Sequence, residues 1–211
     1  MCDPKIVTKD GFASQGLESR RLTPQGLLHF EDIGRENLDV AMEVLFACFE
    51  DEVSKEAIRT VFHAYLKGEI SHSSLVYEGG TIEIKEQYLY RDREAKPVAV
   101  GGLYKESERA LDDICLNWSG VVAQARRKHY GLEVLQHLEQ VAISQGFNSL
   151  SVWKEEESGN FEDLSPQQRM YLKFGMQDYG ERFPYVWEGV ATTEMWLSKK
   201  PLKREAWCVF P

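Results

Sequence analysis

The most informative segment is VVAQARRKHYGLEVLQHL, residues 121–138, where three cations precede an apolar pattern of helical spacing. Arg126, Arg127 and Lys128 stand where the helix should begin. A helix N-terminus already carries partial positive charge and unpaired N–H groups, so cations there cost about 0.3–1 kcal/mol each unless an anion binds among them. Gly131 permits close backbone approach. The segment predicts a pyrophosphate cradle of main-chain N–H groups and basic side chains, with a solvated basic turn as the alternative.

This segment resembles a known family motif. A strand, a basic loop ending in glycine and a leucine-rich helix are similar to the coenzyme-A motif of the GNAT acyltransferase superfamily, R/Q-x-x-G-x-G/A. Residues 126–131 (RRKHYG) match it, with His129 at the position of the first glycine. Residues 171–176 (YLKFGM) resemble the family's Y-x-x-x-G-F helix end, although Leu164 occupies the position of the family's upstream asparagine. The resemblance extends over residues 27–197.

The resemblance implies an α/β fold, with a mixed, mostly antiparallel central sheet flanked by helices. The sheet would be splayed between a strand at residues 117–122 and one at 149–153, and the pantetheine arm of acetyl-CoA or another acyl-CoA would lie in the gap. Tyr171 would act as general acid, because a phenol can protonate a departing thiolate of similar pKa. The implied cofactor-binding residues are Val121, Val122, Arg126, Arg127, Lys128, His129, Tyr130 and Gly131.

The general base is less clearly marked. Asp113 opens the strand that leads into the basic loop, and the two-residue period of a strand puts it on one face with Cys115 and Asn117. Asp113 is the candidate base, and a solvated strand end is its structural alternative. Glu86, Glu155 or a chain of water molecules are further candidates.

The elements that must position these residues follow from periodicity. Alternation and helical spacing predict the order β α α β β β α β α β β, including an antiparallel pair at residues 81–90 and 97–104. We expect one GNAT-like domain over residues 27–198, preceded by a polar leader, 1–26, that is mobile or adds an edge strand. The tail, 199–211, ends in apolar residues that could pack on its own domain or on a second subunit, which leaves a homodimer open.

Composition excludes several classes of protein. The 211 residues are 43% hydrophobic and 28% charged, as in globular domains. A formal net charge of -9 is opposite to that of a typical nucleic-acid-binding protein. We expect no membrane span and no signal peptide, hence a cytoplasmic protein. The four cysteines lack the spacing of a disulfide framework or a zinc site, so no metal is expected.

The resemblance to the GNAT superfamily implies an N-acetyltransferase. It would move an acetyl or short acyl group from acyl-CoA to a primary amine of a small molecule, by direct attack in a ternary complex. Two alternatives stay open: a transferase of the same fold for longer acyl chains, and a non-catalytic module that binds or senses acyl-CoA.

Overall fold

The computed structural model describes residues 21–50, 52–67, 71–72, 81–106, 110–155, 165–187 and 190–202. These residues form a nine-stranded sheet in the order β1-β2-β4-β5-β6-β7-β9-β8, with β3 paired to β4. The strands are β1 (Arg21–Leu22), β2 (His29–Asp32), β3 (Ser71–His72), β4 (Thr81–Arg91), β5 (Pro97–Glu106), β6 (Asp113–Val121), β7 (Ser149–Glu155), β8 (Gln177–Trp187) and β9 (Val190–Pro201).

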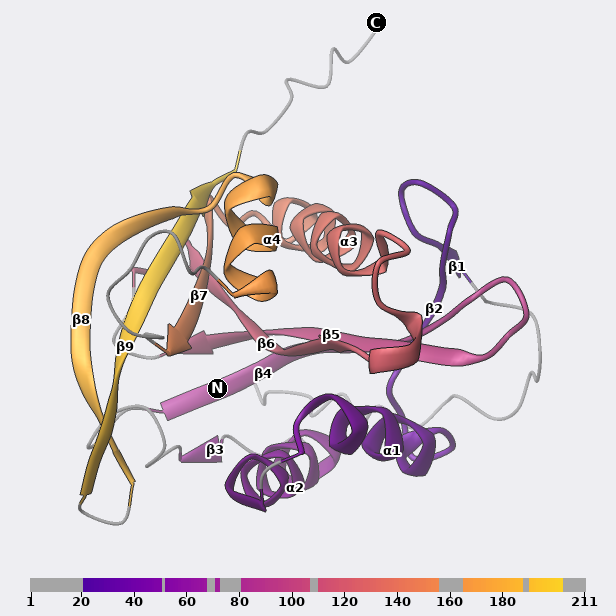
Figure 1. Cartoon of the computed structure of the whole chain (residues 1–211), viewed down its shortest axis with the longest axis horizontal. Coiled ribbons are helices and arrows are strands. Elements are labelled where there is room, and N and C mark those ends of the chain that lie inside the picture. The colour runs from indigo at the N-terminus through magenta and orange to yellow at the C-terminus, as the bar shows by residue number, and fades with distance from the viewer. Residues whose placement is uncertain are drawn as a thin grey trace, which may run out of the picture.

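Helices cover both faces of the sheet (Figure 1): α1 and α2 lie on one face, α3 and α4 on the other. They are α1 (Leu38–Cys48), α2 (Glu52–Lys67), α3 (Tyr130–Ser144) and α4 (Pro166–Phe174), with a short 3-10 turn, η1 (Ala123–Ala125), before α3. The predicted α/β class, with a mostly antiparallel sheet flanked by helices, is therefore confirmed.

The sheet is splayed at β6 and β7, the one parallel pair among the described strands. Only residues 113–115 pair with residues 149–151, although β6 continues to Val121 and β7 to Glu155. Over its whole length β7 pairs with β9 instead. The two strands thus separate after Cys115 and Ser151, and the predicted splay is present.

Most predicted elements agree with the structure, and their differences lie at the ends. The antiparallel pair β4–β5 matches the prediction. α2 begins at Glu52, so Ser54 lies inside this helix. Asn37 does precede α1, but its side chain bonds backwards: its Oδ1 accepts from Gly34 N at 2.8 Å and its Nδ2 donates to Asp32 O at 3.0 Å.

The two ends of the chain lie partly outside the described residues, namely residues 1–20 of the leader and 203–211 of the tail. The end of the leader contributes an edge strand, because Arg21 and Leu22 pair with β2. None of the described helices is both long enough and apolar enough to cross a membrane.

α4 is held in place by local signals at both ends. The Ser165 hydroxyl accepts a hydrogen bond from Gln168 N at 3.2 Å, and the Gln168 side chain accepts one from Ser165 N at 2.9 Å. This capping box, with Pro166 at the first helical position, satisfies N–H groups that the helix leaves unpaired. Gly175 ends the helix with a φ of 95°, a conformation that glycine adopts without strain. These signals fix α4 as one wall of the site described next.

Candidate functional site

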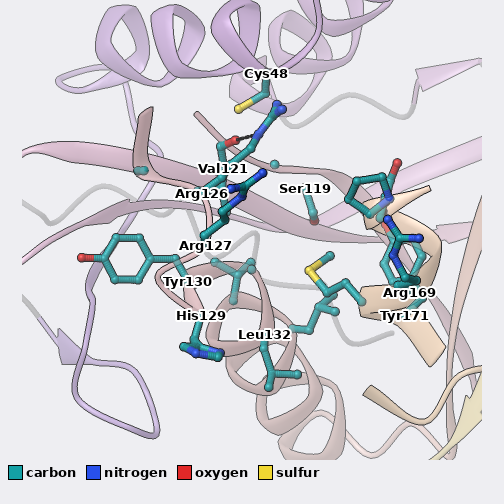
Figure 2. A pocket seen from close by; sticks show the side chains of 18 of the residues that line it. Cys48, Ser119, Val121, Arg126, Arg127, His129, Tyr130, Leu132, Arg169 and Tyr171 are labelled. Carbon is teal, nitrogen blue, oxygen red and sulfur yellow. Dashed lines mark hydrogen bonds between the residues drawn. The ribbon is translucent and has the colours of Figure 1, made fainter. Parts of the chain in front are cut away.

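A cavity of about 1010 Å³ lies at the C-terminal end of β6, between the start of α3 and α4 (Figure 2). Cys48 and Phe49, at the end of α1, border it from the other face of the sheet. Its lining residues are Cys48, Phe49, Ser119, Gly120, Val121, Ala125, Arg126, Arg127, His129, Tyr130, Gly131, Leu132, Val134, Leu135, Ser165, Pro166, Gln167, Arg169, Met170, Tyr171 and Lys173.

The predicted pyrophosphate loop forms a tight turn between η1 and α3. Arg127 and His129 both adopt a φ of 63°, in the left-handed region that favours glycine. A non-glycine residue there costs on the order of 1–3 kcal/mol, and such strain collects at ligand-binding turns. His129, which stands at the family's first glycine, therefore keeps a glycine-like backbone despite its side chain.

The loop's arginines lie beside the end of β6. Arg126 Nε donates to Val121 O at 3.1 Å, which holds the guanidinium along the cavity wall near Cys48 (Figure 2). Burial raises the pKa of the Cys48 thiol to about 11, and the charge of Arg126 offsets part of that rise. Cys48 is therefore a protonated thiol at neutral pH.

Most predicted cofactor-binding residues border the cavity, but Val122 and Lys128 do not. The lining residues from this set are Val121, Arg126, Arg127, His129, Tyr130 and Gly131. Val122 is buried, and its N–H donates to Val98 O at 3.0 Å, so that N–H is already used within the sheet. Lys128 is exposed, with its ammonium 6.0 Å from the centre of the Tyr130 ring.

Gly131 brings α3 and α4 together. A Cβ atom on Gly131 would lie 2.5 Å from Met170 Sδ on α4, which is too close for two heavy atoms. The missing side chain therefore lets α4 pack against the first turn of α3 and brings the cavity's two helical walls into contact.

Tyr171 lies in the wall contributed by α4. Its side chain is 3% exposed, and its hydroxyl oxygen accepts a hydrogen bond from Gln167 Nε2 at 3.0 Å. Burial raises the pKa of Tyr171 above its ordinary 10.0, and the bond from Gln167 offsets part of this rise. Because the phenolic oxygen is the acceptor in that hydrogen bond, the phenolic hydrogen remains available to donate. Tyr171 is thus a protonated donor in the cavity wall.

Asp113 is placed away from the cavity. It lies at the opposite end of β6 from Val121, which is about 26 Å for eight steps along a strand. Its side chain is 1% exposed, and Oδ1 accepts from Ser149 Oγ at 2.8 Å and from Ser151 Oγ at 2.7 Å. The sequence placed Asp113 correctly at a strand end but did not reveal that it is buried beside the neighbouring strand β7. The geometry favours a structural role for Asp113 over the predicted role as base.

Glu86, another candidate base, also lies outside the cavity lining. Glu86 Oε1 accepts from Gln145 Nε2, at the end of α3, at 2.7 Å. The side chain of Glu155 lies outside the described residues, as does Leu164.

The cavity residues that sequence reasoning missed include two pairs from helices α1 and α4. Cys48 and Phe49 reach the cavity from the end of α1, across the sheet, and no local pattern marks that approach. Arg169 and Lys173 come from α4. Their spacing of four residues, on the same helical stripe as Met170, was an available signal.

The charge of the cavity is of one sign. Its charged lining residues are Arg126, Arg127, Arg169 and Lys173, with His129 beside them, and no described Asp or Glu lines it. The chain as a whole has a formal net charge of -9. A cavity of this size and charge suits a large anionic ligand. No three potential metal ligands gather anywhere in the described parts of the chain.

Comparisons with known proteins show what the fold is. No protein-family model matches the sequence, and neither does any curated protein. Solved structures do match. A GNAT family acetyltransferase from Elizabethkingia anophelis with acetyl-CoA bound has 14% identity and a TM-score of 0.54, covering 83% of this chain and 98% of that one.

Other matches agree. An N-acetyltransferase from Staphylococcus aureus has 13% identity and a TM-score of 0.55, covering 83% of this chain and 99% of that one. An IAA acetyltransferase from Bacillus cereus has 16% identity and a TM-score of 0.52, with the same two coverages. With its splayed sheet and the elements around it, the chain has the fold of the GNAT acetyltransferases.

Proposed function

We propose that the protein is an acyl-CoA-dependent N-acyltransferase that moves an acetyl or short acyl group to a primary amine of a small molecule. The observation that carries the proposal is that every charged residue described in the cavity lining is a cation, although the chain as a whole is acidic. Coenzyme A is a large anion with an apolar, amide-containing arm. The cavity offers cations at the α3 loop and uncharged surface along β6.

Donor binding would depend on the loop before α3. Arg126 and Arg127 would bind the pyrophosphate together with N–H groups at the start of the helix, where the helix dipole favours an anion. That anion would also offset the cost of placing cations at this end of α3. The pantetheine arm would extend from there along Val121 and the end of β6.

In the proposed reaction, the amine nitrogen attacks the thioester carbonyl, a C–N bond forms, and the C–S bond breaks. Tyr171 would donate its proton to the departing thiolate, and the attacking nitrogen would lose a proton to water. Because burial raises its pKa, Tyr171 stays protonated over the neutral range. The proposal assigns no proton transfer to Asp113.

The first experiment is thermal unfolding with acetyl-CoA or with free CoA. Ligand at 100 times its Kd stabilises the folded state by about 2.7 kcal/mol, which at about 2–4 °C per kcal/mol raises Tm by about 5–11 °C. Arg126→Ala and Arg127→Ala should each weaken binding about tenfold or more, since a charge-assisted hydrogen bond contributes about 1.5–3 kcal/mol.

Arg93→Ala is the matched control, because it removes the same charge from the exposed β4–β5 turn outside the cavity. Unchanged affinity in the Arg126→Ala and Arg127→Ala variants would refute the pyrophosphate assignment. Release of CoA thiol with members of a primary-amine panel tests transfer itself. Tight binding without release for any amine would instead favour the non-catalytic acyl-CoA-binding alternative.

A further inference from the structure

Two buried side-chain amides flank one glycine in the middle of the sheet. Gly102 of β5 pairs with Gln87 of β4 on one side and with Asn117 of β6 on the other. Gln87 is 1% exposed and Asn117 is 7% exposed. A Cβ atom on Gly102 would overlap the Gln87 carboxamide. The missing side chain therefore lets this amide lie over β5, the strand that separates Gln87 from Asn117.

The neighbouring glycine identifies the face of the sheet on which the amides lie. A Cβ atom on Gly101 would meet Val134 and Leu138 of α3. Successive side chains of a strand point to opposite faces, so Gly102 belongs to the face that α1 and α2 cover (Figure 1). Cross-strand partners share a face, which places both amides there too. Tyr171, on α4, lies on the other face.

Asn117 lies where the sheet splays. β6 pairs with β7 only as far as Cys115 and Ser151, so Asn117 belongs to the stretch of β6 that has no β7 neighbour. The Asn117 carbonyl accepts a hydrogen bond from Ser119 Oγ at 2.5 Å, and Ser119 lines the cavity. Asn117 is thus next to the cavity along β6, with its side chain on the face of α1 and α2.

Both amides have a hydrogen-bond donor without a partner. Gln87 Nε2 and Asn117 Nδ2 are buried and meet no acceptor in the described part of the chain. A buried donor left unpaired lowers the stability of the fold. Such donors are rare in native proteins, and a bound ligand is one reason for them. The pair is suited to bind an oxygen atom of a ligand placed over Gly102.

The reaction needs an acceptor that approaches the thioester at the splay. Building on the proposed function, we propose that Gln87 and Asn117 bind the acceptor through an uncharged carbonyl oxygen beside its amine. A carboxylate fits less well, because two neutral amides do not compensate a buried charge. The acceptor class is then amino-acid amides and other primary amines with a neighbouring carbonyl, in preference to plain alkylamines and free amino acids.

The test compares amino-acid amides with amines that lack the carbonyl: leucinamide with 3-methylbutylamine, and phenylalaninamide with phenethylamine. Release of CoA thiol by the full chain gives kcat/KM for each. Asn117→Leu and Gln87→Met replace an amide by an apolar group of similar size. Each should lower the ratio of kcat/KM for amide over plain amine at least tenfold from its wild-type value, because one hydrogen bond of about 1.4 kcal/mol is lost. Comparing this ratio between variant and wild type cancels the different basicities of the amines.

Two further readouts exclude a merely structural role. Both variants should bind CoA within about twofold of wild type. Their Tm should equal that of wild type or exceed it, because each loses an unpaired buried donor. Asn37→Leu is the matched control, since both amide atoms of Asn37 are hydrogen-bonded. It should lower Tm by at least about 2 °C and leave the ratio unchanged.

An unchanged ratio in both variants, or a loss of Tm like that of Asn37→Leu, would overturn the acceptor assignment and leave the proposed function standing. Turnover confined to amines without a carbonyl would do the same. If free leucine and phenylalanine react as well as their amides and lose as much in the variants, the preference for an uncharged oxygen is wrong. If no amine of any class releases thiol, the proposed function fails and the acceptor site fails with it.

Discussion

The chemistry of Tyr171 depends on where its ring lies. The ring is buried in the packed side of α4, while the residue still lines the cavity. Burial disfavours the phenolate, which raises its pKa, and the hydrogen bond from Gln167 favours the phenolate by less. A buried, neutral phenol is suited to donate a proton and not to accept one.

Tyr171→Phe should therefore lower kcat by about 10²- to 10⁴-fold, while the Kd of acetyl-CoA stays within about twofold. In the wild-type protein, ionisation of Tyr171 should cause no loss of rate between pH 7 and 9, because burial raises its pKa above 10.0 and the acid form predominates below that pKa. Steady-state rates and binding titrations as a function of pH check both statements.

Tyr65→Phe is the matched control. Burial also raises the pKa of Tyr65, which lies on α2 and does not line the cavity, so its kcat should equal that of wild type. Full turnover in Tyr171→Phe would remove the general-acid role.

At the scale of elements, the junction of β6 and β7 sets the width of the splay. The Asp113 carboxylate receives both hydroxyls of Ser149 and Ser151, at 2.8 and 2.7 Å. These serines span the whole length over which β6 and β7 pair. Asp113, in the first residue pair, thus links β6 to Ser149 beside it and to Ser151 in the last pair before the strands separate, which makes it a positioning residue for the splay.

Asp113→Asn should destabilise the fold by about 1–3 kcal/mol, since a buried charge-assisted network is broken, and lower Tm by about 2–12 °C. The pH profile of kcat/KM should not change. Asp112→Asn is the matched control, because its carboxylate is exposed, and it should lower Tm less. A shifted pH profile with unchanged stability would restore Asp113 as the base.

Local signals explain which elements were predictable. The cap at Ser165, the stop at Gly175 and the strand alternation of β4 and β5 lie within single segments, so the sequence reveals them. The pairing register of two strands that are distant in sequence cannot be predicted from the hydrophobic periodicity of either strand. The period of two placed Asp113 on one face with Cys115, but the parallel pairing with β7 determines what that face meets.

The same reasoning explains the candidate site. The loop at residues 126–131 was predictable because one contiguous motif carries it. Arg169 borders the cavity from α4, whose Met170 packs against Gly131, and Phe49 borders it from the end of α1, beside Gly120 of β6. These contacts join segments that are distant in sequence, so no local pattern in the sequence reveals them.

On the scale of the whole molecule, the net charge of the protein is negative, whereas the charged residues described around its cavity are positive. A net charge of -9 repels an anionic ligand at long range, whereas the described cations around the cavity attract it at short range. Salt screens both the repulsion and the attraction, with a Debye length of about 10 Å at 0.1 M salt and about 3 Å at 1 M. The sign of the salt dependence therefore reports which contribution dominates.

We expect the short-range contribution to dominate, because the ligand phosphates would lie within a Debye length of Arg126, Arg127, Arg169 and Lys173. Raising salt from 0.05 to 0.5 M should weaken CoA binding by roughly three- to tenfold, as screening removes part of each attraction. Pantetheine, which lacks phosphates, is the control, and its affinity should change by less than about twofold. An affinity for CoA that rises with salt would mean that repulsion by the acidic chain outweighs attraction by the cations of the cavity, and would contradict the phosphate contacts on which the proposed function depends.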